Sequence, residues 1–191
     1  MNALNGIKEV VESAKSKFAD SPLGKKAESF EKDKTKNYDA PLGKDVKGCP
    51  ENNGNWEGER GNSKWIPESD YVPQKCNRNE QKTWGEILNQ YGIDGIVFKD
   101  GEPDFSSVSK GEVKIEGFSS NRSDNFDKAD IELAKQKGCS PENVHKWCDD
   151  NGYTWHERRD IGIMQKVPSK IHSNISHRGG ISRIKEIENN G

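Results

Sequence analysis

The sequence is poor in apolar residues and has no long apolar run. Only 29% of its 191 residues are hydrophobic, 32% are charged, and the mean hydropathy is −1.08. No stretch approaches the ~20 apolar residues that span a bilayer, so we expect no membrane insertion by this segment. The N-terminus also lacks a basic region followed by an apolar core, so we expect no signal peptide. This composition favours one compact domain with a loose N-terminal part.

Cysteine is scarce, and its spacing argues against a zinc ribbon. The four cysteines form no C-x-x-C pair: Cys49, Cys76, Cys139 and Cys148. Structural zinc ribbons use such pairs, and disulfide-stapled secreted scaffolds contain cysteine at higher density. We therefore predict free, partly buried thiols.

The chain also lacks the strongly basic balance of a dedicated nucleic-acid binder, because its net charge is −2. The charge is nevertheless uneven. Residues 151–191 hold seven basic and four acidic side chains, a local excess of three positive charges. A basic face on an acidic protein still attracts phosphates. The acidic remainder of the surface is either simply solvated or suited to a different partner.

Apolar periodicity predicts the elements of the chain. An amphipathic helix is expected over residues 3–18, followed by polar linker or coil over residues 19–64. Thr83 and Glu86 form a capping box for a helix over 83–91. Strands are expected at 93–98, before the Asp100-Gly101 turn, and at 113–118. Helices are expected at 125–137 and 140–149, the second capped by Ser140 with Pro141 at its first position.

Three of the four histidines fall between residues 156 and 177, in a strand–turn–strand–helix pattern. His156 lies on a β-prone segment over 153–157, and a second strand follows over 162–167. A helix opening at Pro168-Ser169 carries His172, and Gly179-Gly180 closes the unit beyond His177. Five residues apart on one helix, His172 and His177 would point roughly 140° apart, so we expect the helix to end near residues 174–175. The predicted fold class is α+β.

This pattern suits phosphodiester hydrolysis with one divalent metal ion. The reaction needs a base that titrates near neutral pH and a cation that stabilises charge on the phosphate. Imidazole serves both purposes, because its pKa lies near 6.5 and its neutral nitrogen binds borderline metals. A hairpin folded onto a helix brings strand and helix histidines to one point.

The motifs in this region resemble a known family. Tyr-Thr-Trp-His-Glu at 153–157, Met-Gln-Lys-Val-Pro-Ser-Lys-Ile-His at 164–172 and His-Arg-Gly-Gly-Ile-Ser at 177–182 are similar to the WHH-type nucleases of the HNH/endonuclease VII superfamily. These nucleases form C-terminal toxin domains of bacterial polymorphic toxins. Upstream strings at 61–65, 91–96 and 100–105 resemble the region that precedes the motif, so the resemblance spans roughly residues 50–185.

The resemblance implies a ββα-metal (His-Me) finger over residues 151–182, within a nuclease toxin domain at 50–191. Residues 1–49 would then be a remnant of a longer effector. The implied cofactor is one divalent ion, Mg²⁺, Mn²⁺, Ni²⁺ or Zn²⁺. The implied substrate is DNA, and the implied partner is a cognate immunity protein. The chain would be secreted or delivered, and would act in the cytoplasm of a target cell.

The resemblance also implies residue roles. His172 and His177 match helix-side metal ligands, and His156 lies on the strand that supplies the catalytic histidine. Glu157 stands where the family has a second histidine, which leaves two alternatives. In the first, His156 is the base and Glu157 ligates or orients the metal. In the second, His156 is a ligand and Glu157 is the base. We favour the first, because the pKa of imidazole suits a base near neutral pH. Arg178, Arg158 and Lys170 are the candidate phosphate-binding residues.

Two rival interpretations remain beside the nuclease. Helices 125–137 and 140–149, joined by a short turn, would suit a non-enzymatic helix-turn-helix DNA-binding module, but the second helix offers only Lys146 against three acidic residues. A protein-interaction domain with a structural metal site is the other rival. We interpret His145 as structural or exposed and Trp155 as a core anchor.

Overall fold

The computed structural model describes residues 45–190. The helix expected over residues 3–18 lies outside the described residues, as does the linker up to residue 44. Within 45–190, small antiparallel sheets and five helices form a mixed α+β fold, in line with the predicted class. None of the helices in this part of the chain is long and apolar enough to cross a membrane.

The first sheet has the order β1-β2-β3-β4 and is antiparallel throughout. Its strands are β1 (Gly54–Trp56), β2 (Lys64–Pro67), β3 (Ile96–Lys99) and β4 (Glu102–Pro103). The prediction of coil up to residue 64 is wrong at Gly54–Trp56 and at Lys64, because β1 pairs with β2, Trp56 opposite Trp65. Three-residue strands carry too little periodicity to be read locally. The helix α3 (Trp84–Gln90) begins at the predicted capping box of Thr83 and Glu86.

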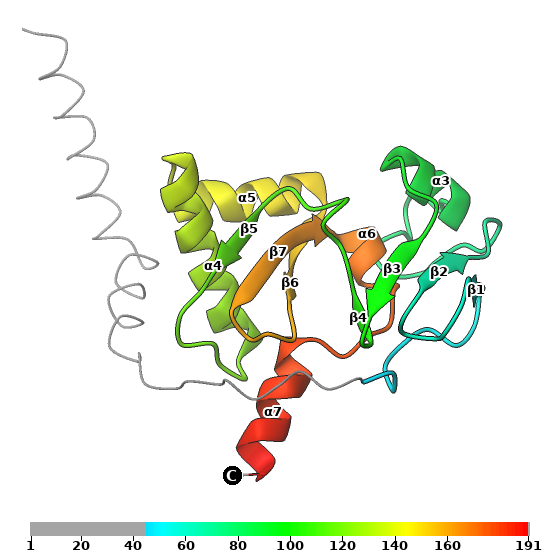
Figure 1. Ribbon diagram of the computed structural model, residues 1–191. Coiled ribbons are helices and arrows are strands. Elements are labelled where there is room, and N and C mark those ends of the chain that lie inside the picture. The colour runs from blue at the N-terminus through cyan, green and yellow to red at the C-terminus, as the bar shows by residue number, and fades with distance from the viewer. Residues whose placement is uncertain (1–44, 191) are drawn as a thin grey trace, which may run out of the picture.

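The second sheet has the order β5-β7-β6 and is covered by two helices (Figure 1). Its strands are β5 (Glu112–Lys114), β6 (Tyr153–Glu157) and β7 (Ile163–Pro168). The strand predicted over 113–118 stops at Lys114, because Lys114 pairs with Ile163, the first residue of β7. The helix α4 (Arg122–Lys137) starts three residues earlier than predicted, at the Asn121 cap. The helix α5 (Pro141–Asn151) has the predicted Ser140 cap.

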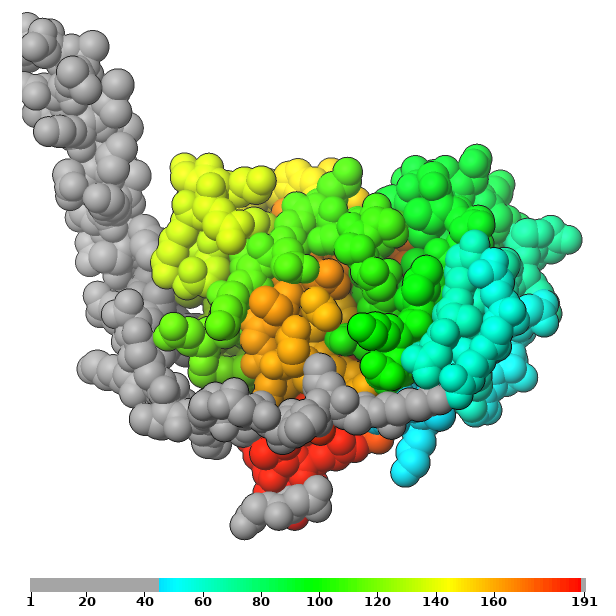
Figure 2. Space-filling view, in the orientation of Figure 1, coloured from blue at the N-terminus to red at the C-terminus, as the bar shows by residue number. Residues whose placement is uncertain are grey.

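The β6–β7 hairpin lies between two hydrophobic cores and takes part in both. Val167 packs in the first core, with α3 and the β1–β4 sheet. Trp155 and Met164 pack in the second core, with α4. Trp155 is only 3% exposed, which confirms its prediction as a core anchor. In Figure 2 the orange surface of the hairpin lies between the green surface of the preceding chain and the red surface of the C-terminal helix.

Two helices follow the hairpin. The first, α6 (Ser169–His172), is a single turn that ends with Ser173 as its cap, slightly before the predicted end. The second, α7 (Gly180–Asn190), was not predicted, since Gly179-Gly180 was read only as the close of the unit. A Cβ on Gly180 would lie 2.6 Å from the carbonyl oxygen of Arg158 and 2.7 Å from Phe118 Cζ. Glycine is therefore required there because α7 begins directly against the end of β6.

Candidate functional site

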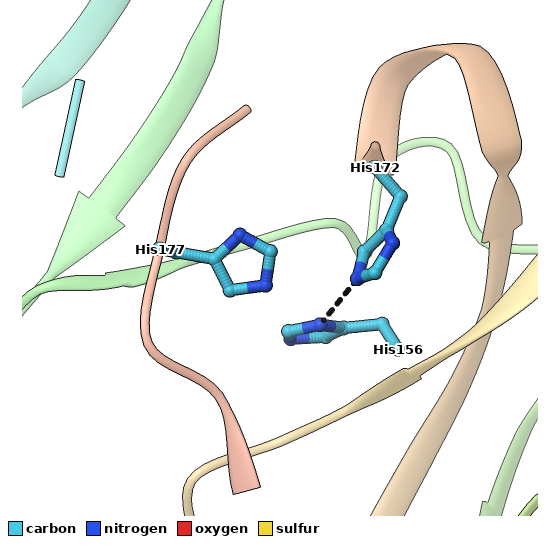
Figure 3. Close-up of side chains that lie close together, drawn as sticks. All are labelled: His156, His172 and His177. Atoms are coloured by element: carbon cyan, nitrogen blue, oxygen red, sulfur yellow. Dashed lines mark hydrogen bonds between the residues drawn. The ribbon is translucent and has the colours of Figure 1, made fainter. Parts of the chain in front are cut away.

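Three histidines from three segments converge on one point (Figure 3). His156 comes from β6, His172 is the last residue of α6, and His177 lies in the loop before α7. One potential ligand atom from each lies within 4.8 Å of the others. The ring of Phe105 packs against all three imidazoles, with centroid separations of 4.9, 5.7 and 5.8 Å. The predicted meeting of strand and helix histidines is therefore present in the fold.

The spacing of these nitrogens fits a shared metal ion. His156 Nδ1 lies 3.2 Å from His172 Nε2. Two nitrogens bound at ~2.0–2.1 Å to one tetrahedral ion are separated by about 3.3–3.4 Å. His177 donates its Nδ1 hydrogen to the carbonyl oxygen of Ile175 at 2.8 Å, which leaves its Nε2 as the free lone pair. The candidate ligand atoms are thus His156 Nδ1, His172 Nε2 and His177 Nε2.

The imidazoles are held in the neutral form that binds metals. Burial lowers the pKa of His156 well below its usual value, and the neighbouring His177 and His172 lower it further. Burial lowers the pKa of His172 to about 3, with a further contribution from His177. Burial also lowers the pKa of His177, against the opposing hydrogen bond to Ile175. A cluster of neutral nitrogen donors suits Zn²⁺ or Ni²⁺ better than Mg²⁺, which prefers oxygen.

Glu157 does not lie among the histidines. Successive residues of a strand point to opposite faces, and Glu157 turns toward the start of α4. Its carboxylate accepts hydrogen bonds from Arg122 Nε at 2.9 Å and from Asn125 Nδ2 at 2.8 Å. Burial raises the pKa of Glu157, while Asn125 and Arg122 lower it. The structure therefore separates Glu157 from the site at which the resemblance would place it.

Glu102 is a carboxylate beside the histidines that the sequence reasoning missed. Its Oε1 lies 4.0 Å from His156 Nε2, a buried atom with no hydrogen-bond partner. The same oxygen accepts the backbone N–H of Arg159 at 2.7 Å, which holds the carboxylate in place. Metal-bound histidines commonly donate their second nitrogen to such a carboxylate. Glu102 and Phe105 both belong to the 100–105 string, whose resemblance to the family was the available signal.

Arg122 is the second residue that the sequence reasoning missed. Its side chain is 63% exposed although its Nε is bound to the nearly buried Glu157. The positive charge of Arg122 lowers the pKa of each histidine in the cluster. A guanidinium anchored at one nitrogen and exposed beside a metal site has the chemistry to bind a phosphate. No local pattern distinguished Arg122, because α4 is remote from the histidines in sequence.

The three predicted phosphate-binding residues all contact carboxylates. Arg178 forms ion pairs with Asp45 Oδ2, at 3.0 Å, and with Glu186. Lys170 forms an ion pair with Glu80 and is 20% exposed. Arg158 lies 3.6 Å from Glu102 and 3.8 Å from Asp160, a looser arrangement. Arg158 is therefore the least tightly paired of the three, and its charge also lowers the pKa of His156.

His145 lies apart from the cluster, as predicted. Its Nδ1 contacts Asp130 Oδ2 at 3.1 Å, and Trp155 Nε1 donates to the other oxygen of the same carboxylate at 2.9 Å. Lys146, the one basic residue that the helix-turn-helix interpretation had on α5, forms an ion pair with Asp150. The helices α4 and α5 thus pack on the second sheet and present no free basic face along α5.

Comparison with known families agrees with the site. Residues 95–179 match the DNase/tRNase domain of colicin-like bacteriocins, a region that is less than half of the chain but contains all three histidines and Glu102. The match supports a nuclease toxin domain and so implies a hydrolase. No curated protein matches the chain.

Proposed function

We propose that this chain is a metal-dependent endonuclease that hydrolyses phosphodiester bonds of DNA. The convergence of three neutral imidazoles, inside the segment that matches bacteriocin nucleases, is the observation that carries the proposal. The hairpin β6–β7 with α6 would form the ββα-metal finger. His156, His172 and His177 would hold one divalent ion, for which the nitrogen donors favour Zn²⁺ or Ni²⁺. When bound, that ion would polarise the scissile phosphate and acidify a bound water.

The convergence of the three histidines favours the role of metal ligand for His156 over the role of base. Its Nδ1 faces His172, and its Nε2 faces Glu102 rather than open solvent. Glu102 would orient the His156 ring. Glu157 would act at a distance, by holding Arg122 so that the exposed guanidinium nitrogens meet a phosphate oxygen. Arg158 would supply a second positive charge close enough to lower the pKa of His156.

A plasmid-cleavage assay tests the proposal. The purified chain would be incubated with supercoiled plasmid and Zn²⁺, Ni²⁺, Mn²⁺ or Mg²⁺ singly, or with EDTA. We expect metal-dependent nicking that His156→Ala abolishes. His145→Ala is the matched control, because it removes an imidazole outside the cluster. Absence of nicking by the folded chain with every metal tested would refute the proposal. A parallel reaction on tRNA tests the DNA assignment, which cleavage of tRNA alone would contradict.

A second variant separates phosphate binding from metal binding. Arg122→Gln would remove the exposed positive charge and leave the three histidine side chains in place. Hydrogen bonds to charged groups contribute ~1.5–3 kcal/mol, so kcat/KM should fall roughly 10- to 100-fold at saturating metal. Lys146→Gln, which removes an exposed positive charge on α5, is the matched control. Equal losses in both variants would indicate a general charge effect instead.

The biological role that we propose is that of a bacterial toxin effector. The supporting observation is again the match to a colicin-like bacteriocin domain, which suggests a delivered effector. A cognate immunity protein would neutralise the chain in the producing cell. Expression of the chain in a bacterium should therefore be toxic, and His156→Ala should relieve that toxicity. Growth that is unaffected by the active protein would contradict the role as a toxin.

A further inference from the structure

A cavity of about 250 Å³ lies beside the turn that carries the histidines. We call it the aromatic cavity. Its lining includes three aromatic residues, from β2, the following loop and α3, and two residues of the turn itself: Trp65, Tyr71, Trp84, Asn174 and Ser176. Trp65 and Trp84 are almost fully buried, so Tyr71 is the ring that is exposed there. The last two residues fall between His172 and His177 in sequence. One wall of the aromatic cavity is therefore the same turn that holds the proposed metal ligands.

The turn and the loop that carries Tyr71 are joined by a specific contact. Asn174 accepts the backbone N–H of Lys75 at 3.0 Å and donates to the Lys75 carbonyl at 2.7 Å. A third bond, from the Asn174 amide to the carbonyl of Lys170, ties the same side chain to α6. These hydrogen bonds fix the position of the aromatic cavity relative to the histidine site, so one ligand could contact both.

The size and chemistry of the aromatic cavity suit one neutral heterocyclic ring. Its volume equals that of about eight waters at ~30 Å³ each, and it is smaller than the ~300–1,000 Å³ of pockets for drug-sized ligands. No lysine or arginine lines it, while Glu51 does, so it is unsuited to phosphate. Glu51 and the side-chain amides of Asn52 and Asn53 also line the cavity and offer hydrogen-bond acceptors and donors.

We propose that the aromatic cavity receives one unpaired base of the DNA strand whose phosphate lies at the histidine site. This inference rests on the proposed nuclease function and specifies its substrate. Tyr71, which is 37% exposed, would stack on the base. A base held in this way is withdrawn from its duplex, and unpairing costs least in DNA that is already single-stranded or distorted. The protein should therefore bind and cut single strands in preference to intact duplex.

Binding in EDTA tests this proposal without cleavage. Fluorescence anisotropy would measure the affinity of the full chain for an eight-nucleotide single strand, for the same strand with its bases removed at the central sugars, and for the duplex. Tyr71→Ala loses base–aromatic stacking, so it should bind the intact single strand roughly 5- to 150-fold more weakly than the wild type. The variant and the wild type should bind the abasic strand equally. Tyr71→Phe should restore binding, since it keeps the ring.

Trp147→Ala is the matched control, because Trp147 is a similarly exposed ring, 38%, on α5. The slope of log affinity against log salt should not change in Tyr71→Ala, because the phosphate contacts remain. Two results would overturn the proposal: equal affinity for duplex and single strand, or equal loss of affinity for intact and abasic strands. The second result would indicate that the cavity binds an aromatic side chain of a partner protein instead of a base. Plasmid nicking in the metal assay decides the nuclease function independently of either result.

Discussion

Replacing Glu102 with glutamine should weaken metal binding without unfolding the protein. Glu102 Oε1 faces the unpartnered Nε2 of His156 at 4.0 Å, so a small rotation would bring the two atoms to hydrogen-bond distance. Loss of such an outer carboxylate typically lowers metal affinity 10- to 100-fold, or ~1.4–2.7 kcal/mol. Because 4.0 Å exceeds a formed hydrogen bond, we expect the lower end, about tenfold. Glutamine retains the oxygen that accepts the Arg159 N–H, so the local backbone should be preserved.

Competition with a chromogenic chelator at pH 7 would measure the Zn²⁺ affinity, and urea unfolding in EDTA would measure stability. The contact of Glu102 with Arg158 is partly exposed and long, so its loss should change stability by at most ~1 kcal/mol. Glu112→Gln is the matched control, since Glu112 is an exposed carboxylate on β5 bonded to Gln165. If Glu102→Gln bound Zn²⁺ as tightly as the wild type while His172→Ala did not bind it, Glu102 would have no role in orienting His156.

Three further predictions follow from the contacts. Zn²⁺ at about 100 times its dissociation constant should stabilise the protein by ~2.7 kcal/mol, which raises Tm by roughly 5–10 °C in calorimetry. EDTA or His177→Ala should remove that rise, and a rise that survives in the variant would contradict the ligand set. Gly180→Ala should cost about 1–3 kcal/mol in urea unfolding because its Cβ meets backbone, whereas Gly162→Ala, with no neighbour closer than 3.9 Å, should cost little. Burial raises the pKa of Asp130 above its unfolded value of 3.8, so its contribution to stability is complete below pH 3.8 and is lost as pH rises through the folded value. The stability of Asp130→Asn relative to the wild type should therefore increase over that window, and a constant difference would count against a buried charged Asp130.

Elements with strong local signals were predicted closely. The capping box at Thr83, the Ser140-Pro141 start of α5 and the β6–β7 hairpin all appear where the sequence places them. Caps and alternating strands depend on neighbours within a few residues, so a local reading suffices. The strands β1 and β4 escaped it, since each has three residues or fewer and exists only by pairing with a distant segment.

The side chains around the site show the same division. The order of His156, His172 and His177 along strand, helix and loop predicted their convergence, because a hairpin followed by a helix returns the chain to one point. The direction of Glu157 was open in the sequence, where either histidine or glutamate could face the metal. Pairing with β7 turns Glu157 toward Asn125 and Arg122 on α4.

The sequence by itself determined the β6–β7 hairpin, the helix caps and the meeting of the three histidines, because these follow from periodicity, turn chemistry and spacing within about twenty residues. Only the tertiary structure brought Glu102, Phe105 and Arg122 to the histidines from segments that precede them by more than thirty residues. It also paired Arg178 and Lys170 with the carboxylates of Asp45 and Glu80. Burial and ion pairing depend on which segments distant in sequence come into contact, and the local sequence does not specify those contacts.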